Sequence, residues 1–175
     1  YEVPHSLSYE TLYHWQVIAK NMDGETPGPV WSFTTYSLPD LQVTSIISPP
    51  EAFSRQTAQI SWTVTNTGHG PTNVPVWYDL LYMSANPVFN QYTALYLGRF
   101  ENSSYLPAGE SYTTTATVNL PQDFIGDYYF FIQINPYGDL LESNPANNVS
   151  RTNVATSIKL TPPPDLKVIS MIVPD

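Results

Sequence analysis

Apolar and polar side chains alternate through most of this chain with the two-residue period of a β-strand. In residues 58–66, Ile60, Trp62 and Val64 share one face while polar side chains occupy the other, and residues 111–119 repeat this pattern. Residues two apart point to the same side of a strand, so each stretch predicts a strand with one buried and one solvated face. Strands of this kind pair antiparallel in a β-sandwich.

Seven stretches with strand character follow one another between turn-forming residues, and no stretch has a helical period. Residues 127–135 are apolar on both faces, so we expect them at the centre of a sheet. Short strands separated by turns are typical of immunoglobulin-like folds. We therefore predict an all-β, immunoglobulin-like sandwich of seven antiparallel strands. The strands are expected at residues 40–46, 58–66, 74–83, 94–100, 111–119, 127–135 and 153–160.

The first 36 residues predict a separate and incomplete unit. Residues 12–20 alternate as a strand, residues 21–29 are dense in turn formers, and residues 30–35 form a second strand. Two strands alone are not a stable unit in water, so we expect them to need partners that the sequence before them would supply.

A phrase at the start of the sandwich occurs again at the end of the chain. Residues 39–50 read PDLQVTSIISPP and residues 164–175 read PDLKVISMIVPD. A repeat of such long period indicates duplication of a whole domain, and hence a tandem array. We divide the chain into residues 1–36, the sandwich at 37–162, and residues 163–175 as a linker and the first strand of a following repeat. Seven of the twelve aligned positions are identical: Pro39/Pro164, Asp40/Asp165, Leu41/Leu166, Val43/Val168, Ser45/Ser170, Ile47/Ile172 and Pro49/Pro174.

Composition is typical of extracellular β-proteins. Charged residues make up only 12% of the chain, beside 17 prolines and 13 tyrosines. The net charge is −9 and no basic stripe exists, so nucleic acid is not expected as a partner. The absence of cysteine excludes disulfides and thiolate metal sites, and no apolar run is long enough for membrane insertion. We expect a secreted or cell-surface protein.

The sequence predicts no catalytic site and no cofactor, and we expect no enzyme. The three histidines, His5, His14 and His69, are scattered without the spacing of metal ligands. Nucleophile elbows, zincin motifs, phosphate loops and EF-hand loops do not occur. The acidic residues of the sandwich, Asp79 among them, fall mostly at turns and strand ends, where solvated carboxylates are expected.

Residues 135–148, NPYGDLLESNPANN, form the richest polar loop. Asp139 and Glu142, with three asparagines, offer the oxygen ligands that weak calcium sites use. In the structural alternative, a Tyr-Gly-Asp turn opens the loop, Leu140 and Leu141 anchor it, and asparagine side chains bond to local backbone. We favour the structural interpretation, and Asp139 and Glu142 remain the calcium candidates.

The aromatic content raises the alternative of a sugar-stacking surface. Trp62 lies on the apolar face of its stretch and is predicted to belong to the core. The face of Trp77 is ambiguous, with the core favoured. Trp15 and Trp31 fall in the two N-terminal strands.

Two families resemble parts of this sequence. Leu7, Thr11 and Tyr13 stand in the order L-x-x-x-T-x-Y and precede VIAKN, GETPGP and WSFTT. This arrangement resembles the last two strands of a fibronectin type III domain. The resemblance implies that Tyr13 is the corner tyrosine, whose hydroxyl bonds back to nearby backbone.

The segments PDLQVTSIISPPEA, ISWTVTNTGHGPT, WYDLLYMS, LPAGESYTTTATVNLP, GDYYFFIQ and ESNPANN follow in order. Together they resemble CARDB, the cell-adhesion-related domain found in bacteria. The resemblance implies a seven-stranded sandwich that is used, often in tandem, in large secreted or surface proteins. The family often carries two acidic residues where this chain has Asn86 and Thr93, so any cation site that needs them would be lost.

We therefore expect a non-catalytic spacer and adhesion module of a bacterial surface protein. Its expected partners are neighbouring domains or identical subunits in a fibre, with surface glycans or proteins as further candidates. The alternative is an accessory carbohydrate- or calcium-binding module of a secreted hydrolase. Two accounts of the incomplete ends stay open: further sequence completes them, or neighbouring subunits complete them by β-strand addition and build an open filament.

Overall fold

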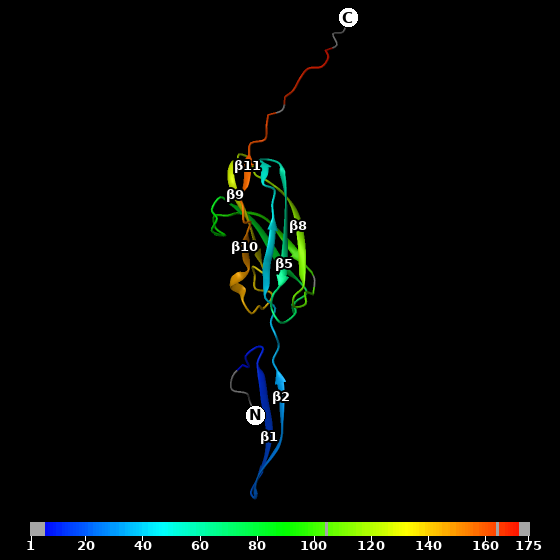
Figure 1. Ribbon diagram of the computed structural model, residues 1–175, viewed down its shortest axis with the longest axis vertical. Coiled ribbons are helices and arrows are strands. Elements are labelled where there is room, and N and C mark those ends of the chain that lie inside the picture. The colour runs from blue at the N-terminus through cyan, green and yellow to red at the C-terminus, as the bar shows by residue number, and fades with distance from the viewer. Residues whose placement is uncertain (1–5, 104, 164, 172–175) are drawn as a thin grey trace.

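The structure is a computed structural model that describes residues 6–103, 105–163 and 165–171. Three parts follow one another along the long axis (Figure 1). A two-stranded hairpin lies at one end, the sandwich lies in the middle, and the C-terminal segment extends from the far end (Figure 1). The preceding and following segments therefore join the sandwich at opposite ends.

The N-terminal hairpin pairs β1 (Leu12–Asn21) with β2 (Gly24–Thr34) in antiparallel register. The predicted long turn over residues 21–29 is wrong, because β2 already begins at Gly24. The Asn21 side-chain oxygen accepts hydrogen bonds from the backbone N–H groups of Asp23 and Gly24, at 2.9 and 3.1 Å, and so closes a much shorter turn. Short side-chain-to-backbone bonds of this kind are the usual role of asparagine in turns.

The sandwich consists of two sheets joined by loops and one short 3-10 helix, η1 (Pro145–Asn147). Among the described residues, no helix is both long and apolar enough to cross a membrane. The smaller sheet has the order β3–β5–β8, and the larger sheet has the order β4–β11–β9–β6–β7, with β10 also paired to β9. The strands are β3 (Leu41–Ile47), β4 (Glu51–Phe53), β5 (Thr57–Asn66), β6 (Trp77–Ser84), β7 (Leu95–Asn102), β8 (Ser111–Asn119), β9 (Gly126–Ile134), β10 (Val149–Arg151) and β11 (Thr156–Lys159).

Strands occur at all seven predicted stretches, but the seven-stranded antiparallel description is incomplete in two ways. The short strands β4 and β10 are additional, and β4 pairs with β11 in parallel. Pro49 and Pro50 separate β3 from β4, and because proline has no N–H to give to a ladder, the chain leaves the smaller sheet there and joins the larger one. Thr156 holds this crossing by donating its hydroxyl to the Pro49 carbonyl at 2.7 Å.

The core lies between the two sheets, as the alternating patterns predict. Residues 58, 60, 62, 64 and 66 of β5 are buried, and the intervening positions are exposed or partly exposed. The prediction that residues 127–135 lie centrally is confirmed, because β9 has paired strands on both sides. The outer face of β9 and β6 holds a second apolar cluster, in which Phe89 from the loop after β6 covers Leu80, Tyr82 and Phe131.

We predict that Trp62→Ala destabilises the sandwich by about 3–5 kcal/mol, the usual cost of a large-to-small change in a core. Trp62 is 1% exposed, and its ring meets Phe100 edge-on at 5.1 Å. Urea unfolding measures the effect. Tyr92→Ala is the control, because Tyr92 is 88% exposed, and it should change stability by about 0.5 kcal/mol or less. Equal effects of the two substitutions would contradict the face assignment of β5.

Candidate functional site

A buried carboxylate joins the two sheets at the centre of the sandwich. Asp79 on β6 is 1% exposed. Its Oδ2 accepts a hydrogen bond from the indole N–H of Trp62 on β5 at 2.7 Å. The hydroxyl of Tyr112 on β8 donates to Oδ1 at 2.9 Å, and the same hydroxyl accepts the indole N–H of Trp77 at 3.2 Å. Four side chains from three strands thus form one polar network across the interface of the sheets.

Burial raises the pKa of Asp79 to about 6, against the opposing effect of the hydrogen bonds from Trp62 and Tyr112. Burial, followed by the charge of Asp79, also raises the pKa of the Tyr112 hydroxyl, which therefore stays protonated and able to donate. Sequence reasoning missed this network, because it counted Asp79 among solvated acids and left the face of Trp77 open. The available signal was an acidic residue in the middle of the apolar run WYDLLYM.

The linker before the sandwich is docked rather than free. Asp40 donates its N–H to the Asn66 side-chain oxygen at 3.0 Å, and the Thr67 N–H donates to the Asp40 carbonyl at 2.7 Å. Both carboxylate oxygens of Asp40 are also used. Oδ2 accepts the Thr67 hydroxyl at 3.0 Å, and Oδ1 accepts the Asn147 amide at 3.0 Å. The surrounding residues therefore recognise this aspartate through its side chain as well as its backbone.

The residues on either side of Asp40 are held in the same way. The Leu38 carbonyl accepts the Gly70 N–H at 3.0 Å, and the Pro39 carbonyl accepts the Ser143 N–H at 2.9 Å. Leu41 is fully buried and donates its N–H to Glu142 Oε2 at 2.7 Å. We call the residues that hold Leu38–Leu41 the linker cradle. They are Asn66, Thr67, Gly68, Gly70, Glu142, Ser143 and Asn147.

Two glycines of the cradle let the linker backbone come close. A Cβ atom at Gly70 would lie 1.9 Å from the Ser37 carbonyl oxygen, and one at Gly68 would lie 2.5 Å from the Asp40 nitrogen. His69, between them, pairs with Glu10 of the N-terminal part at 3.0 Å. Residues 68–70 are thus the surface against which the linker packs. The sequence analysis had considered only His69 among them.

The structure separates the two calcium candidates. Glu142 is buried, and besides Leu41 its carboxylate accepts the amides of Asn135 at 2.6 Å and Asn148 at 2.7 Å. Burial raises the pKa of Glu142, against the three hydrogen bonds that favour its charged form. Asp139 is exposed in the turn. Within the described residues, no group of three or more His, Cys, Asp or Glu side chains is placed to hold a metal ion.

The loop between β9 and β10 is arranged largely as the structural alternative expects. Asn135 bonds to the backbone N–H and carbonyl of Leu140, at 3.1 and 2.7 Å, and Leu140 is buried. The expectation that Leu141 also anchors the loop is wrong, because this side chain is 50% exposed. Leu140 and Glu142 turn inward, and in an extended segment the residue between them faces the solvent.

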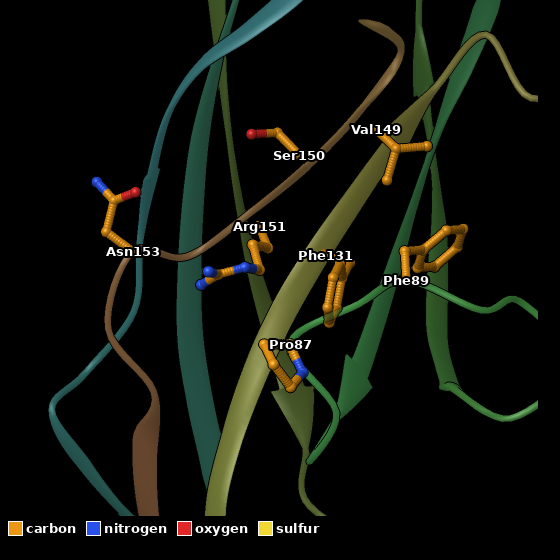
Figure 2. A pocket seen from close by; sticks show the side chains of 7 residues that line it. All are labelled: Pro87, Phe89, Phe131, Val149, Ser150, Arg151 and Asn153. Atoms are coloured by element: carbon orange, nitrogen blue, oxygen red, sulfur yellow. The ribbon is translucent and has the colours of Figure 1, made fainter. Parts of the chain in front are cut away.

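A shallow groove lies on the outer face of the larger sheet, between the loop after β6 and strand β10. Figure 2 shows the ring of Phe131 between Pro87 and Phe89, with Arg151 beside it. Phe131 is only 2% exposed, and the guanidinium of Arg151 lies over the ring of Tyr129 at 4.6 Å. Rings packed in this way leave little open face for a stacking sugar.

The tryptophans divide into two pairs. Trp62 and Trp77 are both buried, which confirms the core prediction for Trp62 and places Trp77 in the core as well. Trp15 and Trp31 stack on each other at 4.5 Å across the N-terminal hairpin and remain about half exposed. The Tyr13 hydroxyl beside them accepts the Ser8 N–H at 2.9 Å, the bond expected of a corner tyrosine.

Comparison with known proteins bears on the sandwich. The family model of CARDB matches residues 38–152, which is more than half of the chain. The chain belongs to the CARDB family. A CARDB crystal structure from Pyrococcus furiosus, determined in complex with di-metal ions, has a TM-score of 0.54 and 22% identity, and the match covers 73% of this chain and all of that one. A solution structure of the same CARDB domain gives a TM-score of 0.50 and 21% identity, covering 71% and 98%. No curated protein sequence matches significantly.

The CARDB match covers the network around Asp79 and the whole linker cradle, and the solved CARDB domains support the sandwich fold. Of the two positions where the family often has acidic residues, Asn86 caps its own turn by accepting the Val88 N–H at 2.9 Å. Thr93 donates its hydroxyl to the Asn90 carbonyl at 3.4 Å. Both side chains therefore serve the local loop of this CARDB domain.

The CARDB sandwich should become more stable as the pH falls from 7 toward 4. The pKa of Asp79 is raised from 3.8 in the unfolded chain to about 6 in the fold. Its contribution to stability is therefore fully present below pH 3.8 and is lost as the pH rises through 6. One pKa unit corresponds to 1.36 kcal/mol, so the shift is worth about 3 kcal/mol. Urea unfolding across this pH range measures it.

The control is Asp79→Asn, which keeps the shape of the side chain but cannot titrate. This variant should lose about 3 kcal/mol of the pH-dependent change. The dependence from all other carboxylates, including the buried Glu142, should remain in both proteins. Parallel pH profiles for the two proteins would contradict the assignment to Asp79.

Calcium should leave the melting temperature of this CARDB domain unchanged. Both oxygens of Glu142 are taken by protein donors, so a metal would have to displace hydrogen bonds that hold the linker. Among the residues that the structure describes, the buried side-chain oxygens of Asn147 and Asn148 have no hydrogen-bond partner, and they are the groups a cation would have to recruit. Thermal melts in millimolar calcium and in chelator test this. A rise of several degrees that Glu142→Gln abolishes would contradict it, because binding to the folded state stabilises it.

Proposed function

We propose that this CARDB domain is a non-catalytic spacer and adhesion segment of a large secreted or cell-surface bacterial protein. The family supports an adhesion-related module, and CARDB is a non-catalytic domain family. The observation that carries the proposal is the position of the two connecting segments at opposite ends of the sandwich (Figure 1). Domains connected at opposite ends extend in a line. The two ends of a tandem array are therefore separated by the summed length of its domains.

The proposal gives each part of the chain a role in such an array. Residues 1–36 are the last strands of a fibronectin type III-like domain, whose apolar face with Trp15 and Trp31 the rest of that domain would cover. Residues 37–162 are the CARDB unit, and residues 163–175 begin the next one. The partners are neighbouring domains of the same chain or identical subunits in a fibre.

The pairing of β4 with β11 suits a unit that carries tension. β4 follows β3, the first strand of the sandwich, β11 directly precedes the C-terminal connection, and the two strands run parallel. The Ser157 N–H donates to the Pro50 carbonyl at 3.0 Å, and the Ser54 N–H donates to the Lys159 carbonyl at 2.8 Å. Pulling the two ends apart would slide β4 along β11, so these bonds would be loaded together in shear and would have to break together.

Single-molecule pulling on the full chain, held at its two ends, tests the spacer role. We expect the sandwich to unfold in one step, and Ser157→Pro should lower the unfolding force because it removes the N–H that bonds to Pro50. Ser157→Ala keeps this bond and is the matched control. Unfolding at forces near the noise in the wild type, or equal forces for both variants, would count against the role in carrying tension.

The alternative function, an accessory carbohydrate- or calcium-binding module of a secreted hydrolase, has one supporting observation. The similar CARDB domain from Pyrococcus furiosus was determined in complex with di-metal ions. A glycan array and the calcium melts decide between the two functions. Specific glycan binding that depends on the groove residue Arg151, or a calcium-dependent melting temperature, would favour the alternative.

A further inference from the structure

A pocket of about 480 Å³ lies where the loop over residues 135–148 meets the outer face of the larger sheet. Gln133 on β9 and Val149 on β10 line it from the sheet, and Tyr137, Leu141 and Glu142 line it from the loop. Among the described residues that form this lining, Glu142 is the only charged one. The pocket therefore combines one acid with polar and apolar walls and contains no basic side chain.

Two acceptor atoms at this pocket have no hydrogen-bond partner among the described residues. Asn148 is 7% exposed, and its side-chain amide donates to Glu142 at 2.7 Å, whereas its Oδ1 has no partner. The NH₂ group must face the carboxylate, so the oxygen is the atom that Asn148 can offer to a ligand. The Oε1 of Gln133 is likewise buried without a partner. A ligand that donates hydrogen bonds would remove the free-energy cost of these two buried acceptors.

Glu142 adds a buried negative charge to the pocket. The side chain is 6% exposed, and no ion pair within the described residues involves it. Its three hydrogen-bond donors are neutral N–H groups. Arg99 and Arg151, the arginines of the same outer face, each lie over a tyrosine ring at 4.6 Å instead. An incoming cation would therefore meet an attractive negative potential.

The exposed part of the pocket is apolar. Tyr137 is 57% exposed, Leu141 is 50% exposed and Val149 is 37% exposed. Buried acceptors beside exposed apolar side chains suit a primary ammonium group on an aliphatic stem, because lysine packs its stem against apolar surface and donates three hydrogen bonds. Calcium suits the pocket less well, since it needs six to eight oxygen ligands and both oxygens of Glu142 are already used.

We propose that this pocket binds the side chain of a lysine on the surface of a partner protein. The ammonium group would donate to Gln133 Oε1 and Asn148 Oδ1, with rotation of the half-buried Gln133 side chain bringing its oxygen to the ligand. The charge of Glu142 would attract the ammonium group while the carboxylate keeps its bond to the linker. The protein surface around such a lysine would also cover the exposed apolar side chains of the pocket. This recognition site goes beyond the spacer role and does not depend on it.

Nuclear magnetic resonance titration of the ¹⁵N-labelled chain of 175 residues tests the site with Nα-acetyl-lysine methylamide as the probe. The side-chain amide signals of Gln133 and Asn148 should shift and saturate with a Kd on the order of 1 mM, the strength usual for a ligand of this size. The norleucine analogue has the same stem without the ammonium group and should cause no saturable shift. Equal shifts from both probes would overturn the proposal.

Two pairs of variants locate the binding. Gln133→Leu should weaken binding about tenfold, because a hydrogen bond to a charged donor is lost. Gln59→Leu, on the exposed face of β5, should leave it unchanged. Glu142→Gln and Asp139→Asn each remove one negative charge, and only the first should weaken binding. Equal effects within either pair would overturn the site. Melting temperatures identify any variant that folds poorly, and the Gln133→Leu pair leaves the bonds of Glu142 intact.

Two further probes distinguish a lysine from other sources of an ammonium group. Methyl glucosaminide carries the group on a sugar ring without an aliphatic stem, and it should bind at least about tenfold more weakly than the lysine probe. Tighter binding of this sugar would overturn the assignment to a protein. n-Pentylamine has the stem and the ammonium group but no peptide. It should also bind more weakly, since it covers less of the apolar wall, and equal or tighter binding would assign the pocket to a free amine.

Discussion

The buried carboxylate of Asp79 is the constraint on which the arrangement of the two sheets depends. The chain has no cysteine, so no disulfide joins the sheets. A carboxylate in an apolar core costs several kcal/mol unless donors reach it. Trp62 and Tyr112 are those donors, and they come from neighbouring strands of the opposite sheet. Since a one-residue slip would turn either side chain outward, the need for both donors to reach Asp79 on β6 fixes the register of β5 against β8.

Strand β5, which holds Trp62 beside Asp79, also holds the linker at the end of the sandwich. The alternation that directs Trp62 inward also directs Asn66 inward four residues later, where β5 ends. There the core gives way to backbone that needs hydrogen bonds, and the Asn66 amide provides them to the Gly70 and Leu106 carbonyls and to the Asp40 N–H. One strand therefore sets both the contact between the sheets and the angle at which the preceding linker arrives.

The sequence predicted what local alternation determines and missed what depends on contacts between distant segments. The faces of β5 and β8 and the central place of β9 followed from side-chain periods, because burial on one side leaves a two-residue pattern. The parallel β4–β11 pair and the burial of Asp79 were not predictable in this way, since both depend on a partner far along the chain. Glu142 was recognised as a loop carboxylate, but its role appears only when Leu41, a hundred residues earlier, is placed beside it.

The position of the linker cradle determines which of two successive domains sets the orientation between them. Every contact that holds Leu38–Leu41 comes from the sandwich that follows the linker. In the part of the outgoing linker that the structure describes, the anchor is the Thr161 hydroxyl, which donates to the Ser54 carbonyl before the proline-rich stretch. Prolines favour an extended chain but leave its direction in space open. The orientation between two successive units would then be set by the downstream cradle, and a repeat without its Pro-Asp-Leu sequence would form a flexible joint in an otherwise stiff chain.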